Sequence, residues 1–113
     1  MDRELDRKFL ESGQEAQKLC IALQRYFEDD LDGQWKERYE TYLKQRIRPA
    51  VSQLIRLGEV EKTGMLVEKD WLGSFALEEC IRLAGREGQL EIQIFLLEWK
   101  QKKFGFSDRE YTL

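Results

Sequence analysis

The chain has 113 residues and a net charge of −3, with 42% hydrophobic and 36% charged residues. This length fits a single domain, and the hydrophobic content argues against intrinsic disorder. The sequence contains no histidine, which excludes His-based acid–base catalysis and His-ligated metals. Strong helix formers make up more than half of the residues and β-branched residues are few, so the composition predicts an all-α fold.

The first predicted helix spans residues 3–28, with Asp2 as its N-cap. Its apolar seam follows alternating spacings of four and three: Leu5, Phe9, Ser12, Ala16, Leu19, Leu23 and Tyr26. Gly13 lowers helix propensity within it by about 1 kcal/mol. The seam is small at Ser12 and Ala16, where another helix can approach closely. Two interpretations stay open: packing inside the same domain, or a seam between two copies of the chain.

The second predicted helix spans residues 34–46, after an acidic turn in which Asp32 is the predicted N-cap. Because the turn is short, we expect the first two helices to form an antiparallel hairpin. Pro49 ends or kinks this run, and a new helix can begin there because proline suits a first helical turn. The apolar face of the second helix consists of Trp35, Tyr39, Tyr42, Leu43 and Ile47.

Four shorter helices are predicted after Pro49. The first covers residues 50–57 and ends at Gly58, and the second covers residues 60–68. A third begins at a Ser74 cap and ends at Gly88, and a fourth covers residues 90–103 and ends at Gly105. The tail, residues 106–113, is expected to be loosely held or docked through Phe106 and Tyr111.

The last predicted helix has apolar residues on two sides. Ile92, Phe95, Leu96 and Trp99 fall on one side, whereas Ile94 and Leu97 fall on the other. A helix that is apolar on two sides needs cover on both. One cover is its own hairpin partner, and the other is a preceding hairpin or another chain. The candidate interaction surface is therefore Ile94, Leu97, Phe95 and Trp99, together with Ala16 and Ser12.

Residues 58–68 and 88–98 align with an offset of 30, glycine with glycine. Two glycine-closed helical hairpins at a fixed spacing are typical of stacked repeats. Residues 83–92, followed by Leu96-Leu97-Glu98, resemble an ankyrin repeat, although the family's Thr-Pro-Leu-His turn has no counterpart here. The resemblance covers about residues 50–104. Such hairpins are similar to the C-terminal parts of uncharacterised bacterial proteins, and they imply a protein–protein interaction module.

The two cysteines, Cys20 and Cys80, are predicted to be small buried residues on apolar helical faces. Two thiols without histidine cannot complete a structural zinc site within one chain. No signal peptide or membrane-spanning apolar run is recognisable, so the expected location is the cytoplasm. No cofactor, metal or membrane partner is expected.

The charged clusters favour structural roles. Basic residues at 44–48 and 100–103 lie at helix ends, where cations complement the helix dipole. Positive charge is spread evenly, which argues against a nucleic-acid partner. Ala84, Gly88 and Ile94 match the spacing of a helix-turn-helix DNA reader, which gives the alternative function, a DNA-binding regulator. The second helix of that motif would carry Glu91, an acidic residue that repels phosphate.

The sequence thus predicts an all-α chain: an N-terminal helical hairpin over residues 1–48, two ankyrin-like hairpins over 49–105 and a tail over 106–113. None of the common nucleotide-binding or hydrolase motifs is present, and no catalytic, cofactor-binding or metal-binding residue is identified. We expect a non-catalytic protein–protein interaction module, either acting alone or serving as the terminal part of a larger protein or assembly. A homodimer and a monomer remain equally open, and the identity of any other protein partner is unknown.

Overall fold

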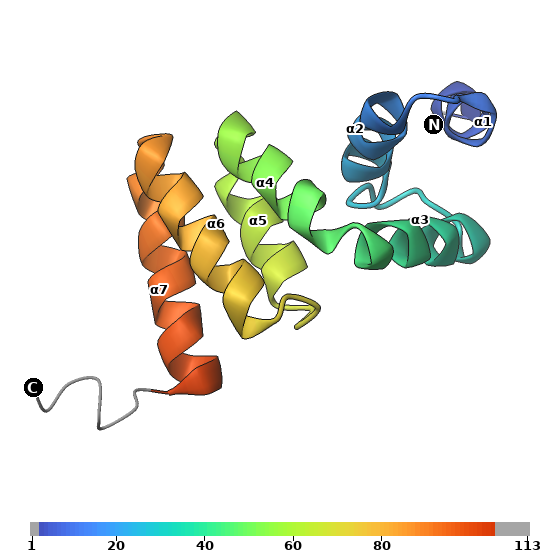
Figure 1. Cartoon of the computed structure of the whole chain (residues 1–113). Helices are drawn as coiled ribbons and strands as arrows, with labels where there is room; N and C mark the ends of the chain where they lie inside the picture. The colour runs from blue at the N-terminus through green and yellow to red at the C-terminus, as the bar shows by residue number, and fades with distance from the viewer. Residues whose placement is uncertain (1–2, 106–113) are drawn as a thin grey trace, which may run out of the picture. The chain divides into compact units, whose positions relative to one another are not determined.

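The computed structural model describes residues 3–105, and this part of the chain is entirely α-helical (Figure 1). The all-α prediction is confirmed. The chain divides into two compact units, residues 1–50 and 51–113, and the division falls within the fourth helix. The seven helices of the described range are α1 (Arg3–Glu11), α2 (Glu15–Arg25), α3 (Gly33–Gln45), α4 (Ile47–Leu57), α5 (Val60–Val67), α6 (Ser74–Arg86) and α7 (Leu90–Phe104).

The prediction of one long first helix is wrong, because α1 and α2 are separated at residues 12–14. The Ser12 hydroxyl accepts a hydrogen bond from the Gln14 backbone N–H at 3.1 Å and donates one to the Gln17 side chain at 2.7 Å. A serine hydroxyl that binds nearby backbone groups competes with the helix, and Gly13 adds its own helix-breaking tendency. The first unit therefore has three helices in place of the expected hairpin, with α1 against α2 and α2 against α3.

The start of α3 follows the predicted signal, whereas α4 begins at Ile47, before the predicted start near Pro49. The Asp32 carboxylate accepts the Trp35 backbone N–H at 2.9 Å, so the predicted N-cap is confirmed. Pro49 lies in the first turn of α4, where its missing N–H leaves no helical hydrogen bond unmade. The predicted Asp2 cap and the tail contacts of Phe106 and Tyr111 lie outside the described residues.

An aromatic cluster forms the core of the first unit. The Phe9 ring meets the rings of Tyr39 and Tyr42 edge-on, with centroids 4.7 and 4.9 Å apart. All three side chains are buried, and edge-to-face contacts are a favoured geometry for aromatic pairs. The prediction that Cys20 is buried is wrong, since it lies on an exposed part of α2, whereas Cys80 is buried as expected.

In the second unit, α4 and α6 end in the same glycine turn. The φ angles are +72° at Gly58 and +71° at Gly88. Each glycine N–H donates to the carbonyl three residues earlier, and the following N–H donates to the carbonyl five residues earlier. This is the Schellman arrangement, which favours glycine because of its positive φ. The expectation that Gly58 and Gly88 occupy equivalent turns is confirmed.

Several buried positions of α4 to α7 recur at an offset of 30. Helix α7 packs against both α6 and α5. Ile81, Ala84, Ile92 and Leu96 are all buried. The predicted Ser74 cap is wrong, because Gly73 holds the N-cap position without a side-chain hydrogen bond. The buried pairs at the common offset are Ala50 and Cys80, Val51 and Ile81, Leu54 and Ala84, and Leu66 and Leu96.

Replacing Gly88 by alanine is expected to lower the free energy of unfolding by about 1–2 kcal/mol, since an L-residue is strained at positive φ. No neighbouring atom lies within 4 Å of the added Cβ, so the cost is one of backbone conformation. Urea unfolding measures the change. Gly33→Ala is the matched control, because it also meets no neighbour and has no positive φ. Equal stability of Gly88→Ala and Gly33→Ala would contradict the assigned turn.

Candidate interaction surfaces

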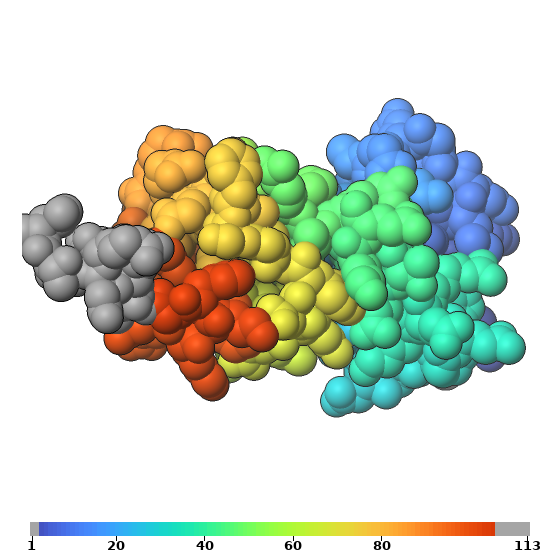
Figure 2. Space-filling view, turned by 60° about the horizontal axis from the view of Figure 1, so that its bottom comes forward, coloured from blue at the N-terminus to red at the C-terminus, as the bar shows by residue number. Residues whose placement is uncertain are grey.

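One line of exposed apolar side chains runs along α7, which lies at the surface of the second unit (Figure 2). Its members recur at spacings of four, three and seven, so they fall on one helical face. We call it the outer stripe of α7. It consists of Leu90, Ile94, Leu97 and Phe104, which are 66%, 49%, 48% and 45% exposed.

The opposite side of α7 faces its own unit. Ile92 and Leu96 are buried, and Phe95 and Trp99 are partly buried. The Phe95 ring packs against Gly64 of α5, since a Cβ at that glycine would lie 3.5 Å from the ring. The division of α7 into an inner and an outer side, predicted from the helical spacing, therefore agrees with the burial of these residues.

The six predicted surface residues differ in exposure, and the four on α7 fall on two sides of that helix. Ile94 and Leu97 lie together on the outer stripe of α7, whereas Phe95 and Trp99 turn partly inward. Ala16 is exposed on α2 of the first unit, and Ser12 is partly buried in the turn before that helix. The outer stripe adds Leu90 and Phe104, which were not among the predicted surface residues.

The basic cluster at the end of α7 is bound to acidic neighbours. Lys100 forms an ion pair with Glu78 of α6, and Lys103 Nζ lies 2.7 Å from an Asp70 carboxylate oxygen. In the other cluster, Arg46 Nε lies 2.8 Å from Glu15. These ion pairs support the prediction that the cations at the helix ends stabilise the fold and do not bind phosphate.

A buried ionic network links the three helices of the first unit. Arg25 of α2 donates two hydrogen bonds to the Asp6 carboxylate of α1, at 2.9 and 3.1 Å, and Tyr39 of α3 donates a further one. Asp6 is 4% exposed and Arg25 is 2% exposed. Arg25 also pairs with Glu28 and lies 3.6 Å from Asp30. Each buried charge is therefore matched, as burial requires.

The network shifts the pKa of its members in opposite directions. Burial alone would raise the pKa of Asp6, but the hydrogen bonds from Arg25 and Tyr39 and the guanidinium charge hold it below its ordinary value. Burial and the hydrogen bond to Asp6 raise the pKa of Tyr39 above its usual range. A charged Asp6 and a neutral Tyr39 are the forms suited to holding α1, α2 and α3 together.

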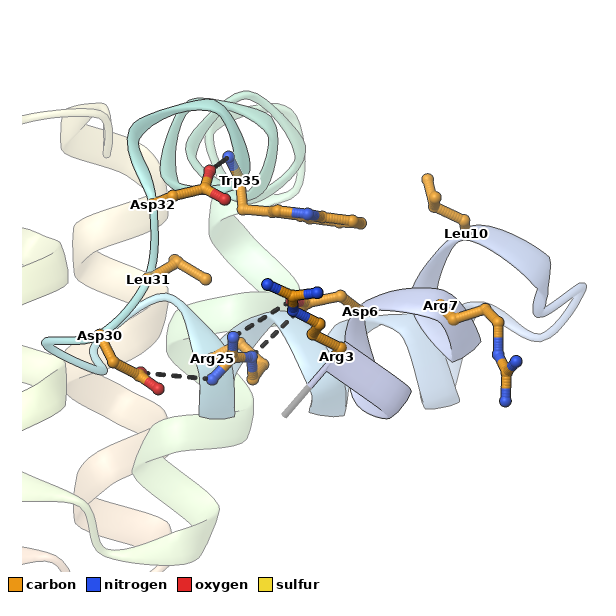
Figure 3. A pocket seen from close by; sticks show the side chains of 9 residues that line it. All are labelled: Arg3, Asp6, Arg7, Leu10, Arg25, Asp30, Leu31, Asp32 and Trp35. Carbon is orange, nitrogen blue, oxygen red and sulfur yellow. Dashed lines mark hydrogen bonds and ion pairs between the residues drawn. The ribbon is translucent and has the colours of Figure 1, made fainter. Parts of the chain in front are cut away.

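A hollow of about 490 Å³ lies beside this network (Figure 3). The Trp35 ring extends along one side, the Arg3 guanidinium lies below it, and Arg7 points away. The lining holds equal numbers of cationic and acidic side chains, so its charges compensate one another. The lining residues are Arg3, Asp6, Arg7, Leu10, Arg25, Asp30, Leu31, Asp32 and Trp35.

A second, more open hollow of about 760 Å³ lies on the same unit, and Leu10 lines both hollows. We call the second hollow the basic groove, because three cations and a single carboxylate line it. It consists of Phe9, Leu10, Lys18, Gln34, Glu37, Arg38, Thr41, Tyr42, Gln45 and Arg46.

The cations of the basic groove lie over aromatic rings. Lys18 Nζ is 4.7 Å from the centroid of Phe9, and the Arg46 guanidinium is 4.2 Å from that of Tyr42. Arg38 lies 4.9 Å from the centroid of Trp35. Contact with an aromatic face attracts a cation without neutralising its charge. Arg46 is also paired with Glu15, so the positive charge of the groove comes mainly from Lys18 and Arg38, and its exposed apolar contact comes from Leu10.

The ionic network was not predicted from the sequence, although the sequence holds a signal for it. Asp6 precedes Phe9 by three residues and Arg25 follows Ala22 by three, so both charges fall on apolar helical faces. Opposite charges on two facing apolar stripes indicate a buried pair. The basic groove had no such signal, because its side chains come from three helices.

Among residues 3–105, no cluster of three or more cysteine and carboxylate side chains is placed to hold a metal ion. Within the same range, none of the helices has the length and apolar character needed to cross a membrane. Comparison of the chain with protein-family models, curated proteins and solved structures finds no match.

Proposed function

We propose that this chain is a non-catalytic protein–protein interaction module, in which two ankyrin-like hairpins present the outer stripe of α7 to another helical hairpin. The partner is a second copy of the chain or a neighbouring subunit of a larger assembly. The observation that carries the proposal is the difference between two equivalent positions. Val67 of α5 is 1% exposed, whereas Leu97, which lies 30 residues later, is 48% exposed.

The equivalence supports a specific kind of partner. Within the second unit, α7 packs against α5, and Phe95 covers Gly64. Ile94 and Leu97 lie 30 residues after Gly64 and Val67 and occupy the corresponding positions on α7, where they are exposed to solvent. Stacked helical hairpins bury such faces against the next hairpin. A further hairpin placed as α7 is placed on α5 would therefore cover Ile94 and Leu97.

Light scattering over a range of micromolar concentrations tests self-association. If the partner is a second copy, the wild-type chain dimerises and the double substitution Ile94→Glu and Leu97→Glu abolishes the dimer, because two charges would be buried in an apolar contact. Met65→Glu is the matched control, since Met65 of α5 is 52% exposed and lies off the stripe. Equal loss of association in both variants would place the interface elsewhere.

If the chain stays monomeric, a photo-crosslinking residue tests whether the outer stripe of α7 binds a neighbouring subunit of a larger assembly. Incorporated at position 97 and expressed in the native host, it is expected to give a discrete crosslinked partner that the same residue at position 65 does not give. Equal crosslinking at the two positions would contradict the proposal, since it would show that α7 has no preferred contact.

A further inference from the structure

We infer that the basic groove of the first unit is a second binding site, which takes a short acidic peptide segment carrying an apolar side chain. The groove consists only of residues between Phe9 and Arg46, so it shares no residue with the outer stripe of α7. The inference does not depend on the function proposed for that stripe.

Charge indicates the class of partner. Lys18, Arg38 and Arg46 line the groove with one carboxylate, Glu37, and Glu15 pairs with Arg46, so one positive charge remains in excess. The protein as a whole has a net charge of −3, so this positive excess is local. Complementary charge steers a partner to such a patch and fixes its register. The adjoining hollow beside the ionic network has no such excess, and for this reason it is not included in the site.

The apolar contact comes from Leu10. Its side chain is 50% exposed, and it lines the groove from α1 opposite the polar face of α3. An apolar side chain of the partner would cover it, while carboxylates on either side would meet the cations. This pattern, an apolar anchor within a charged rim, is common at peptide-binding grooves.

The α3 wall suits a peptide backbone. Gln34, Thr41 and Gln45 lie on one face of α3 and line the groove. Their neutral side chains both donate and accept hydrogen bonds, as peptide groups require. A single-stranded nucleic acid fits less well. Its bases need open aromatic faces, whereas cations lie over the rings of Phe9 and Tyr42.

Fluorescence anisotropy of a labelled probe peptide tests the inference. The probe is a short peptide of glutamates in which a leucine and a phenylalanine stand one helical turn apart. We expect saturable binding that weakens as salt is added. Arg38→Glu is expected to weaken it about tenfold or more and Leu10→Ala about fivefold, whereas Arg82→Glu, the same change on the exposed face of α6, alters it less than about twofold.

Four results would overturn the inference. They are the absence of saturable binding at millimolar peptide, equal weakening by Arg38→Glu and Arg82→Glu, equal binding of a probe with lysines in place of the glutamates, and displacement of the peptide by oligothymidylate. The last would assign the groove to single-stranded nucleic acid. Thermal unfolding followed by circular dichroism shows whether each variant is folded, and Leu10→Ala keeps the test open if the arginine variant is not.

Discussion

Asp6→Ala is expected to lower the free energy of unfolding by about 3 kcal/mol, because removing one member of a buried ion pair leaves the other without compensation. Arg25 would keep Glu28 and Asp30 nearby but lose both hydrogen bonds to Asp6. Urea unfolding followed by circular dichroism measures the loss. Glu4→Ala removes an exposed ion pair of the same helix, with Arg7, and is expected to cost less than about 0.5 kcal/mol.

The same network predicts how stability depends on pH. The pKa of Asp6 in the folded protein lies below the ordinary value of 3.8, so its contribution to stability is fully present above that value. The contribution is lost as the pH falls through the lower, folded pKa. The wild type should therefore lose stability more steeply below pH 3.8 than Asp6→Asn does. Parallel acid profiles for the two proteins would show that Asp6 is not a charged, bound group.

The second large effect separates two adjacent leucines of α7. Leu96→Ala is expected to cost about 3 kcal/mol of unfolding free energy, since Leu96 is fully buried and its loss leaves a cavity. Leu97→Ala should change stability by less than about 0.5 kcal/mol, because half of that side chain already faces solvent. Chemical unfolding of both variants at a concentration where the chain is monomeric measures the difference. Similar losses would mean that the outer stripe is covered within the chain itself.

Features set by neighbouring residues were predictable from the sequence. The turns at Gly58 and Gly88 and the cap at Asp32 depend on local backbone chemistry, which glycine and aspartate signal directly. The two sides of α7 follow from helical periodicity alone. The break between α1 and α2 was missed because the apolar seam continues in register across Ser12 and hides the change of direction.

Features that need several helices to meet were beyond the sequence. The bond between Asp6 and Arg25 spans 19 residues and depends on how α1 folds back on α2. The basic groove needs α1, α2 and α3 in place together. Helical spacing shows which side chains share a face, but it does not show which faces meet.

The packing of α7 against both α5 and α6 sets an order for biosynthesis. Leu66 and Val67 are fully buried in the finished unit, yet the helix that covers α5 is the last of the described helices to leave the ribosome. Until residues 90–104 have emerged, the nascent chain exposes the apolar face of α5, and the second unit cannot complete its core. Folding of this unit therefore waits for the synthesis of α7, and a chaperone that binds short apolar segments would meet α5 in that interval.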